Sequence, residues 1–148
     1  MTVSEALKSL GTTTLKKTDS VSVWLISGIT MYIVNYYYPW LEGEKCFDQL
    51  RLAGKKDFTA MKLDAITGRG TKKDFIDLYF LLQEYNLKTI IDFYTQKFHD
   101  GPPFLVLISL SYFVDADLEQ NPLLLQNICW PVIKKVIIQK LEQYLKDI

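Results

Sequence analysis

The spacing of apolar residues changes once along this chain of 148 residues, and the change divides the chain into two parts. Before about residue 40, β-branched and aromatic residues form two short runs, SVSVWLI and ITMYIVNYYY, which are typical of strands. From Lys56 onward, apolar residues recur about every 3.6 positions, the period of an α-helix. The predicted fold class is therefore α+β, mostly α: a small antiparallel hairpin or sheet followed by a bundle of about five helices.

The β part is expected to cover residues 1–40, with a short helix at residues 3–10, in which Ser4 is the N-cap and Gly11 the stop. The strand runs at 20–39 flank a Ser-Gly dipeptide, which predicts a β-hairpin that ends at a proline, and TTTLKK before them is a third strand or an entry loop. Such a small sheet is marginally stable by itself. We therefore expect its aromatic residues to cover it against the helices, or another chain to complete it.

The helical part is expected to cover residues 56–148, after an irregular stretch at 39–56. Its first helix has about three turns and ends near Gly68 and Gly70, and a capping box from Thr71 to Asp74 begins the second. Further helices are predicted at about 88–98, 103–113 and 131–146, where Trp130-Pro131 begins the last helix. A chain of this length usually forms one domain, so both parts are expected to form a single domain, 1–148.

Charge and cysteine content limit the classes of function. Seventeen basic and seventeen acidic residues cancel, which excludes a global field for DNA or anionic membrane, and no apolar run is long enough to span a bilayer. Locally, residues 51–73 carry a net +5 and residues 74–119 a net −6. These blocks either neutralise each other on packing or place a basic rim beside carboxylates. Cys46 and Cys129 are expected to be free thiols in a reducing cytoplasm.

The most ordered polar pattern lies at residues 62–79. Lys62 and Arg69 fall on one face of the first helix, and a glycine turn can aim both at the start of the second helix, a favourable place for phosphate. Lys73 and Asp77 are spaced i,i+4 on the second helix. The alternative is structural: Asp74 caps the helix, Lys73 and Asp77 form a surface pair, and Lys62 is solvated.

Residues 53–82, AGKKDFTAMKLDAITGRGTKKDFIDLYFLL, resemble the C-terminal motif of the AbiEii/AbiGii toxin family of nucleotidyltransferases, roughly K-x-x-A-[LI]-x-x-R-x-x-x-[RK]-D-x-x-D-L-Y. The stretches at 20–39 and 109–122 are also similar to segments of that family. The residues that match the motif in register are Lys62, Ala65, Ile66, Arg69, Lys73, Asp74, Asp77, Leu78 and Tyr79.

The resemblance implies a remnant of a nucleotidyltransferase fold, an NTP and Mg²⁺ as cofactors, and a role in toxin–antitoxin or phage-defence systems. By carry-over, Lys62 contacts the nucleotide phosphates, and Arg69 and Lys73 support phosphate or acceptor binding. Asp77 or Asp74 is the candidate catalytic carboxylate that orients groups in the pocket. The implied partners are an antitoxin or complementing chain and a nucleotide or RNA.

The chain also departs from the family. The family's Gly-Gly-Ser/Thr turn and its Asp-x-Asp pair do not precede the hairpin, and the position of its third metal carboxylate aligns with Tyr32. No metal ligand is therefore assigned. We expect a truncated or degenerate member that does not catalyse alone and acts through binding. The alternatives are half of a split enzyme, completed by a partner chain, and a helical module for protein interaction only.

Three further groups lie outside the motif. Asp115, Asp117 and Glu119 either bind a hard cation or form a solvated turn, and the turn is favoured. His99 is expected at the surface near a helix C-terminus. The tyrosines at 36–38 either stack bases or protect the sheet, and protection is favoured because no basic residues alternate with them.

Overall fold

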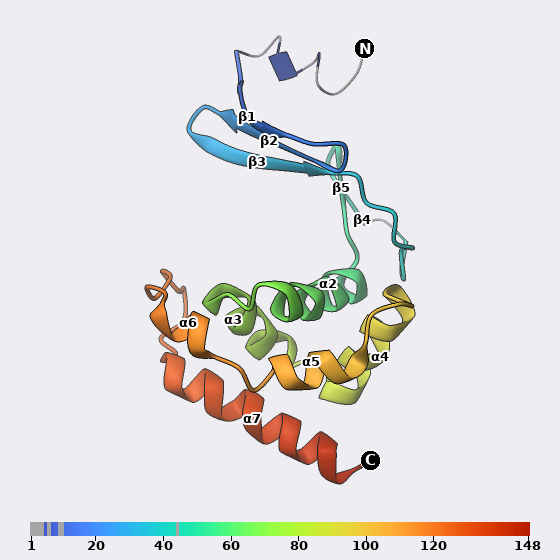
Figure 1. Ribbon diagram of the computed structural model, residues 1–148, viewed down its shortest axis with the longest axis vertical. Helices are drawn as coiled ribbons and strands as arrows, with labels where there is room; N and C mark the ends of the chain where they lie inside the picture. Colours follow the sequence, from blue (N-terminus) through green and yellow to red (C-terminus); the bar gives the residue numbers. More distant parts are fainter. Residues whose placement is uncertain (1–4, 6, 9–10, 44) are drawn as a thin grey trace. The chain divides into compact units, whose positions relative to one another are not determined.

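The computed structural model describes residues 5, 7–8, 11–43 and 45–148. The chain forms two compact units, residues 1–38 and residues 39–148. The first contains a three-stranded sheet, and the second contains a two-stranded β element and the helices α2 to α7 (Figure 1). The predicted α+β, mostly α, fold class is confirmed. That the whole chain is a single domain stays a prediction.

The sheet of the first unit consists of β1 (Thr13–Lys17), β2 (Val21–Ile26) and β3 (Ile29–Val34), antiparallel in that order. The third strand that TTTLKK allowed is therefore present. Ser27 and Gly28 connect β2 to β3 with φ angles of 48° and 81°. Two consecutive positive φ angles produce the tight turn whose twist matches that of the flanking strands.

β3 is shorter than predicted. Val34 pairs with Val21, the first residue of β2, and the next backbone N–H, from Asn35, donates to the Ser20 carbonyl at 2.8 Å. The strand ends there because its partner strand ends, so the prediction that it runs to Pro39 is wrong. The tyrosines at 36–38 follow the sheet and lie outside its ladder.

Most of the helix predicted at residues 3–10, with Ser4 as its N-cap, lies outside the described residues. Glu5, Leu7 and Lys8 are helical. Gly11 has a φ of 68° and donates its N–H to the Lys8 carbonyl, as a helix stop does.

The stretch at 39–56 was expected to be irregular, but part of it forms a β element. β4 (Lys45–Phe47) and β5 (Leu50–Leu52) pair antiparallel. Asp48, with a φ of 54°, provides the left-handed conformation in the intervening turn. The expectation was wrong because this turn uses an aspartate where the usual sequence signal is glycine.

In the second unit (Figure 1), α2, α3, α4 and α7 begin and end close to the predicted positions, and one predicted helix is an exception. Thr71 caps α3 by accepting the Asp74 N–H, as the capping box predicted, and Pro131 lies in the first turn of α7. The helices are α2 (Lys55–Gly68), α3 (Lys72–Leu81), α4 (Leu87–Lys97), α5 (Pro103–Ser109), α6 (Val114–Leu118) and α7 (Trp130–Lys146).

The exception is the helix predicted at 103–113, which ends at Ser109, so that the short α6 follows separately. Two tighter i→i−3 bonds, from Ser111 and Tyr112, end the helix. The chain then turns, and the centre of the Phe113 ring lies 4.8 Å from the centre of the Phe75 ring and 5.9 Å from that of Trp130. This aromatic packing comes from distant residues, so helical periodicity did not predict the break.

One apolar core holds the second unit together, with α2 packed on α3, α4 and α5, and α7 packed on α3 and α4. No described helix is long and apolar enough to cross a membrane. Both thiols are free, as predicted, and both are exposed. The fully buried core side chains include Leu63, Phe75, Leu78, Ile90, Val106, Leu110 and Ile133.

Candidate functional site

The motif residues meet where α2 ends and α3 begins. Gly70, with a φ of 53°, reverses the chain between the two helices, and a Cβ there would lie 3.2 Å from the Ile66 carbonyl oxygen. Glycine fits this turn without strain. The turn brings Lys62 and Arg69 against the first turn of α3, as the sequence predicted.

The Asp74 carboxylate is the centre of the site. Arg69 forms a two-pronged contact with it, Nε to Oδ2 at 2.9 Å and Nη2 to Oδ1 at 3.0 Å. Lys62 Nζ donates to Oδ1 at 3.1 Å, and the Thr71 hydroxyl donates to Oδ2 at 2.6 Å. The Asp74 side chain is 1% exposed. Each oxygen therefore already accepts two hydrogen bonds, so the carboxylate holds the two helices together.

Lys62 connects the two predicted carboxylates. Its ammonium lies 2.6 Å from Asp77 Oδ2 in addition to its contact with Asp74, and 5.3 Å from the centre of the Phe58 ring. The Lys62 side chain is 16% exposed. Asp77 thus pairs with Lys62 and not with Lys73, which is exposed and forms no ion pair within the described part of the chain.

The electrostatics follow from these contacts. Burial opposes ionisation of Asp74, but the hydrogen bonds from Arg69, Thr71 and Lys62 outweigh it and hold the pKa of Asp74 well below its usual range. Burial alone would lower the pKa of Lys62, but Asp77 and Asp74 raise it. Lys62 and Asp74 are therefore both charged at neutral pH and paired with each other.

A carboxylate of the protein lies at the N-terminus of α3, where a phosphate was predicted. Glu119 Oε2 accepts the Lys72 backbone N–H at 2.9 Å. The Lys72 side chain is 4% exposed. Its ammonium donates hydrogen bonds to the Glu119 carbonyl oxygen and, at 3.2 Å, to Asn121 Oδ1. A phosphate must displace Glu119 or bind beside it. Sequence reasoning missed this role of Lys72, because its partners lie more than forty positions away in the chain.

Two of the three carboxylates at 115–119, Asp117 and Glu119, have separate partners. Asp117 accepts hydrogen bonds from the Trp130 indole N–H at 2.6 Å and from the Lys134 ammonium at 2.8 Å. Glu119 accepts the Lys72 N–H at the start of α3. Among the described residues, no three histidine, cysteine, aspartate or glutamate side chains form a group that could hold a metal ion. Asp117 and Glu119 thus fasten α6 and the following segment to α7 and α3.

A second buried carboxylate, which the sequence did not single out, lies at the start of α2. Asp57 Oδ1 accepts from Lys97 Nζ at 2.6 Å, and both side chains are 0% exposed. Asp57 also accepts the Leu41 and Glu42 N–H groups, at 2.9 and 3.2 Å. Burial opposes its ionisation, but Lys97 and the two backbone groups keep its pKa lowered. Lys97 lies on the apolar face of α4, seven positions after Ile90, and this was the available sequence signal.

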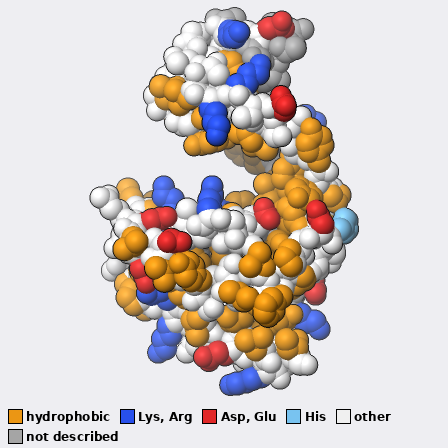
Figure 2. Space-filling model, in the orientation of Figure 1, with side chains coloured by type: hydrophobic (Ala, Val, Ile, Leu, Met, Phe, Trp, Pro, Cys, Tyr) orange, Lys and Arg blue, Asp and Glu red, His pale blue; other side chains and the backbone are white. Residues whose placement is uncertain are grey.

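The predicted blocks of opposite charge neutralise each other in the second unit. Lys62 and Arg69 of the basic block pair with Asp74 and Asp77 of the acidic block, and Lys55 pairs with Glu84 at 2.7 Å. In Figure 2, basic and acidic side chains are interspersed over the visible face of this unit and do not form a single basic field.

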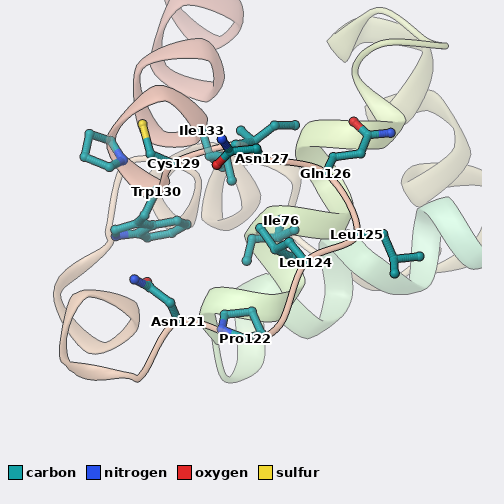
Figure 3. A pocket seen from close by; sticks show the side chains of 12 residues that line it. Ile76, Asn121, Pro122, Leu124, Leu125, Gln126, Asn127, Cys129, Trp130 and Ile133 are labelled. Atoms are coloured by element: carbon teal, nitrogen blue, oxygen red, sulfur yellow. The ribbon is translucent and has the colours of Figure 1, made fainter.

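The hollows near the motif are small. The one lined by Arg69, Gly70 and Tyr112 has a volume of about 130 Å³, below the several hundred Å³ typical of ligand sites. A larger pocket of about 550 Å³ lies between α3, the segment at 121–129 and the start of α7 (Figure 3). Its lining side chains include Ile76, Asn121 and Trp130, and none of the predicted site residues.

The carboxylates present do not fit the Mg²⁺ that the resemblance implies. Both oxygens of Asp74 already accept hydrogen bonds from cationic groups, and Asp77 lies 2.6 Å from the Lys62 ammonium. A divalent cation between them would face Lys62 directly and would be repelled by it. We therefore assign no metal to this cluster and no reaction step through one.

Comparison with known proteins finds one uncharacterised relative of note. The chain is 31% identical over 143 residues to the uncharacterized protein aq_aa25 of Aquifex aeolicus (strain VF5). The match covers 90% of this chain and 66% of that protein, so about a third of the relative lies outside it. No protein-family model matches the chain. No solved structure matches it.

Proposed function

We propose that this chain is a phosphate- and nucleotide-binding protein similar to the AbiEii/AbiGii nucleotidyltransferases, which acts by binding and does not transfer nucleotides alone. Its phosphate contacts are Lys73 and Arg69, at the start of α3. The proposed setting is the bacterial cytoplasm, in a toxin–antitoxin or phage-defence pair, with an antitoxin or complementing chain as partner and a nucleotide or RNA as ligand.

The observation that supports this proposal is the geometry of the motif. The motif residues converge on one buried carboxylate, which fixes Arg69 while 65% of its side chain stays exposed. Lys73 is exposed in the adjacent first turn of α3, and its backbone N–H has no acceptor among the described residues. A fixed guanidinium, a flexible ammonium and a helix-end N–H are together suited to a phosphate group.

The proposal stops at binding because Asp74 and Asp77 serve as partners of cationic side chains. The Gly-Gly-Ser/Thr turn and the Asp-x-Asp pair of the family are absent from this sequence before the hairpin. The split-enzyme alternative therefore needs a second chain that carries both elements.

One observation favours a different function, an interaction module in which the motif only packs the helices. Lys62, the residue expected to contact the phosphates, is 16% exposed and already lies against both Asp74 and Asp77. Glu119 in turn occupies the N-terminus of α3. In this alternative Lys73 has no ligand, so its removal changes no binding property.

Calorimetric titration distinguishes the phosphate-binding function from the interaction module. The full chain is titrated with each NTP, with and without Mg²⁺, and with inorganic triphosphate, which tests the phosphate contacts without a base. We expect a dissociation constant in the micromolar range, and Lys73→Ala is expected to weaken it about tenfold, since a charge-assisted bond contributes about 1.5–3 kcal/mol. Lys88→Ala, which removes an exposed lysine from α4, is the matched control.

Two results would contradict the proposed binding site. The first is the absence of heat with every NTP and with triphosphate, which would leave the packing function. The second is binding that Lys73→Ala and Lys88→Ala weaken equally, which would place the ligand elsewhere. Nucleotide transfer by the purified chain alone would show that the limit to binding is incorrect.

A further inference from the structure

The two edges of the sheet in the first unit differ in how they are protected. The β1 edge carries Lys16 and Lys17 and a register shift between Thr14 and Lys16, features that discourage pairing with another strand. β3, at the other edge, has the sequence ITMYIV, without charge, proline or glycine, and pairs with β2 without a register shift. Of the two edge strands of this sheet, β3 thus lacks the features by which β1 discourages pairing; Figure 1 shows β3 at one edge of the sheet.

The hydrogen-bonding groups on the open edge follow from the ladder. Asn35 donates its N–H to the Ser20 carbonyl, so these two residues form a hydrogen-bonded pair. Hydrogen-bonded pairs alternate along an antiparallel ladder, so Ile33 and Met31 also point their backbone groups toward β2. The residues between them, Thr30, Tyr32 and Val34, point their N–H and C=O groups away from β2, at the open edge.

This edge is complementary to itself. An antiparallel copy related by a two-fold axis at Tyr32 places Tyr32 opposite Tyr32 of the partner subunit, and Thr30 opposite Val34 of the partner subunit. In that register the outward N–H and C=O groups of all three residues find partners. Their side chains share one face with Val23, which pairs with Tyr32. No charged side chain meets a like charge, whereas pairing through β1 would bring lysines together.

We propose that the β3 edge is a self-association site, at which a second copy of this chain adds its own β3 to the sheet. The side chains that flank the joint are exposed in one copy: Ile29 is 70%, Tyr32 67% and Val34 51% exposed. A joint along one strand is smaller than a standard protein interface, so the dimer forms and dissociates with concentration.

Paired charges test both the edge and the register. Thr30→Lys with Val34→Lys places lysines opposite each other across the two-fold axis. Thr30→Glu with Val34→Lys places opposite charges there. Within one copy, positions 30 and 34 lie about 13 Å apart along the strand, too far for an ion pair. The two variants therefore differ mainly through the second copy.

Light scattering after size exclusion measures the mass of the full chain, from roughly micromolar to hundreds of micromolar. We expect a concentration-dependent dimer for the wild type, a dissociation constant at least about tenfold higher for the Lys/Lys variant, and recovery for the Glu/Lys variant. Leu15→Lys, on the protected β1 edge, is the control and leaves the dimer unchanged. Circular dichroism confirms that each variant is folded.

Tyr32→Pro gives an independent measurement if the Lys/Lys variant does not fold. It removes an N–H that points away from β2, so the hydrogen bonds between β2 and β3 stay complete. The two hydrogen bonds that these N–H groups donate at the two-fold axis of the dimer are lost. A wild type that stays monomeric at every concentration would overturn the proposal. So would a dimer that the Lys/Lys and Pro variants leave intact, or a Glu/Lys variant that does not recover.

Discussion

The same four residues, Lys-Lys-Asp-Phe, begin both α2 and α3, at positions 55–58 and 72–75. In both helices the aspartate is buried, with exposed fractions of 0% and 1%. In both, a carboxylate from a distant segment accepts a first-turn N–H at 2.9 Å, Glu42 from Lys56 and Glu119 from Lys72. The same tetrapeptide thus begins both helices, although the Thr71 side chain caps α3 and Gly54, the N-cap of α2, has no side chain to do so.

The partners of the two aspartates differ, and we therefore expect their contributions to stability to differ. Asp57 pairs with Lys97 of α4, and neither side chain reaches solvent. Asp74 pairs with Arg69, which is 65% exposed, and with Lys62. A charge that loses its partner inside the protein keeps the cost of desolvation, whereas an exposed charge returns to water. The first pair is therefore expected to be mainly structural, whereas the second includes a largely exposed guanidinium.

The largest expected effect comes from breaking the buried pair. Lys97→Met keeps most of the side-chain volume but leaves the Asp57 carboxylate unpaired where it is 0% exposed. Removal of one partner from a buried ion pair costs about 3–5 kcal/mol. We expect a loss of that size in the free energy of unfolding, measured by urea denaturation at pH 7.

Lys55→Met is the matched control, because it removes the first lysine of the α2 tetrapeptide from an exposed pair with Glu84. Exposed ion pairs are screened by water and contribute little, so little change in the free energy of unfolding is expected. Equal losses from Lys97→Met and Lys55→Met would show that burial does not distinguish these ion pairs.

A smaller loss is expected at the second aspartate. Asp74→Asn keeps the shape of the side chain but removes the charge that Arg69 and Lys62 share. Arg69 can turn to solvent and Lys62 retains Asp77, so we expect the free energy of unfolding to fall by about 1–3 kcal/mol. Urea denaturation of Asp74→Asn and Lys97→Met under the same conditions shows which variant loses more free energy of unfolding. A loss at Asp74 that exceeds the loss at Lys97 would reverse the comparison.

The two aspartates also show what sequence can predict. Lys62 and Arg69 lie within 12 positions of Asp74, so helical period and a glycine turn sufficed to bring them together. Lys97 lies 40 positions from Asp57, and the two meet only because α2 packs on α4. The ends of α5 and β3 were missed for the same reason, since distant partners determine them. Local pattern therefore predicted the fold class and the motif cluster, but not the buried pair.

The smallest expected effect is a change with pH in the stability that Asp74 contributes. The folded-state pKa of Asp74 lies well below its ordinary value of 3.8. The stabilisation from Asp74 is therefore complete well above pH 3.8. It is lost as the pH falls from there toward the folded-state pKa, because the unfolded chain binds the proton first. An asparagine side chain does not titrate, so the difference in stability between wild type and Asp74→Asn is expected to narrow by about 1 kcal/mol from pH 7 to pH 3.

Urea denaturation of both proteins at pH 7, 5, 4 and 3 measures this narrowing, because the titrations that the two proteins share cancel in the difference. Asp92→Asn, on the exposed side of α4, is the control for the removal of one carboxylate. A difference that stays constant down to pH 3 would mean that Arg69, Thr71 and Lys62 do not hold the charge of Asp74 in the folded protein. In that case the ordered position of Arg69, from which its proposed phosphate contact follows, would need another cause.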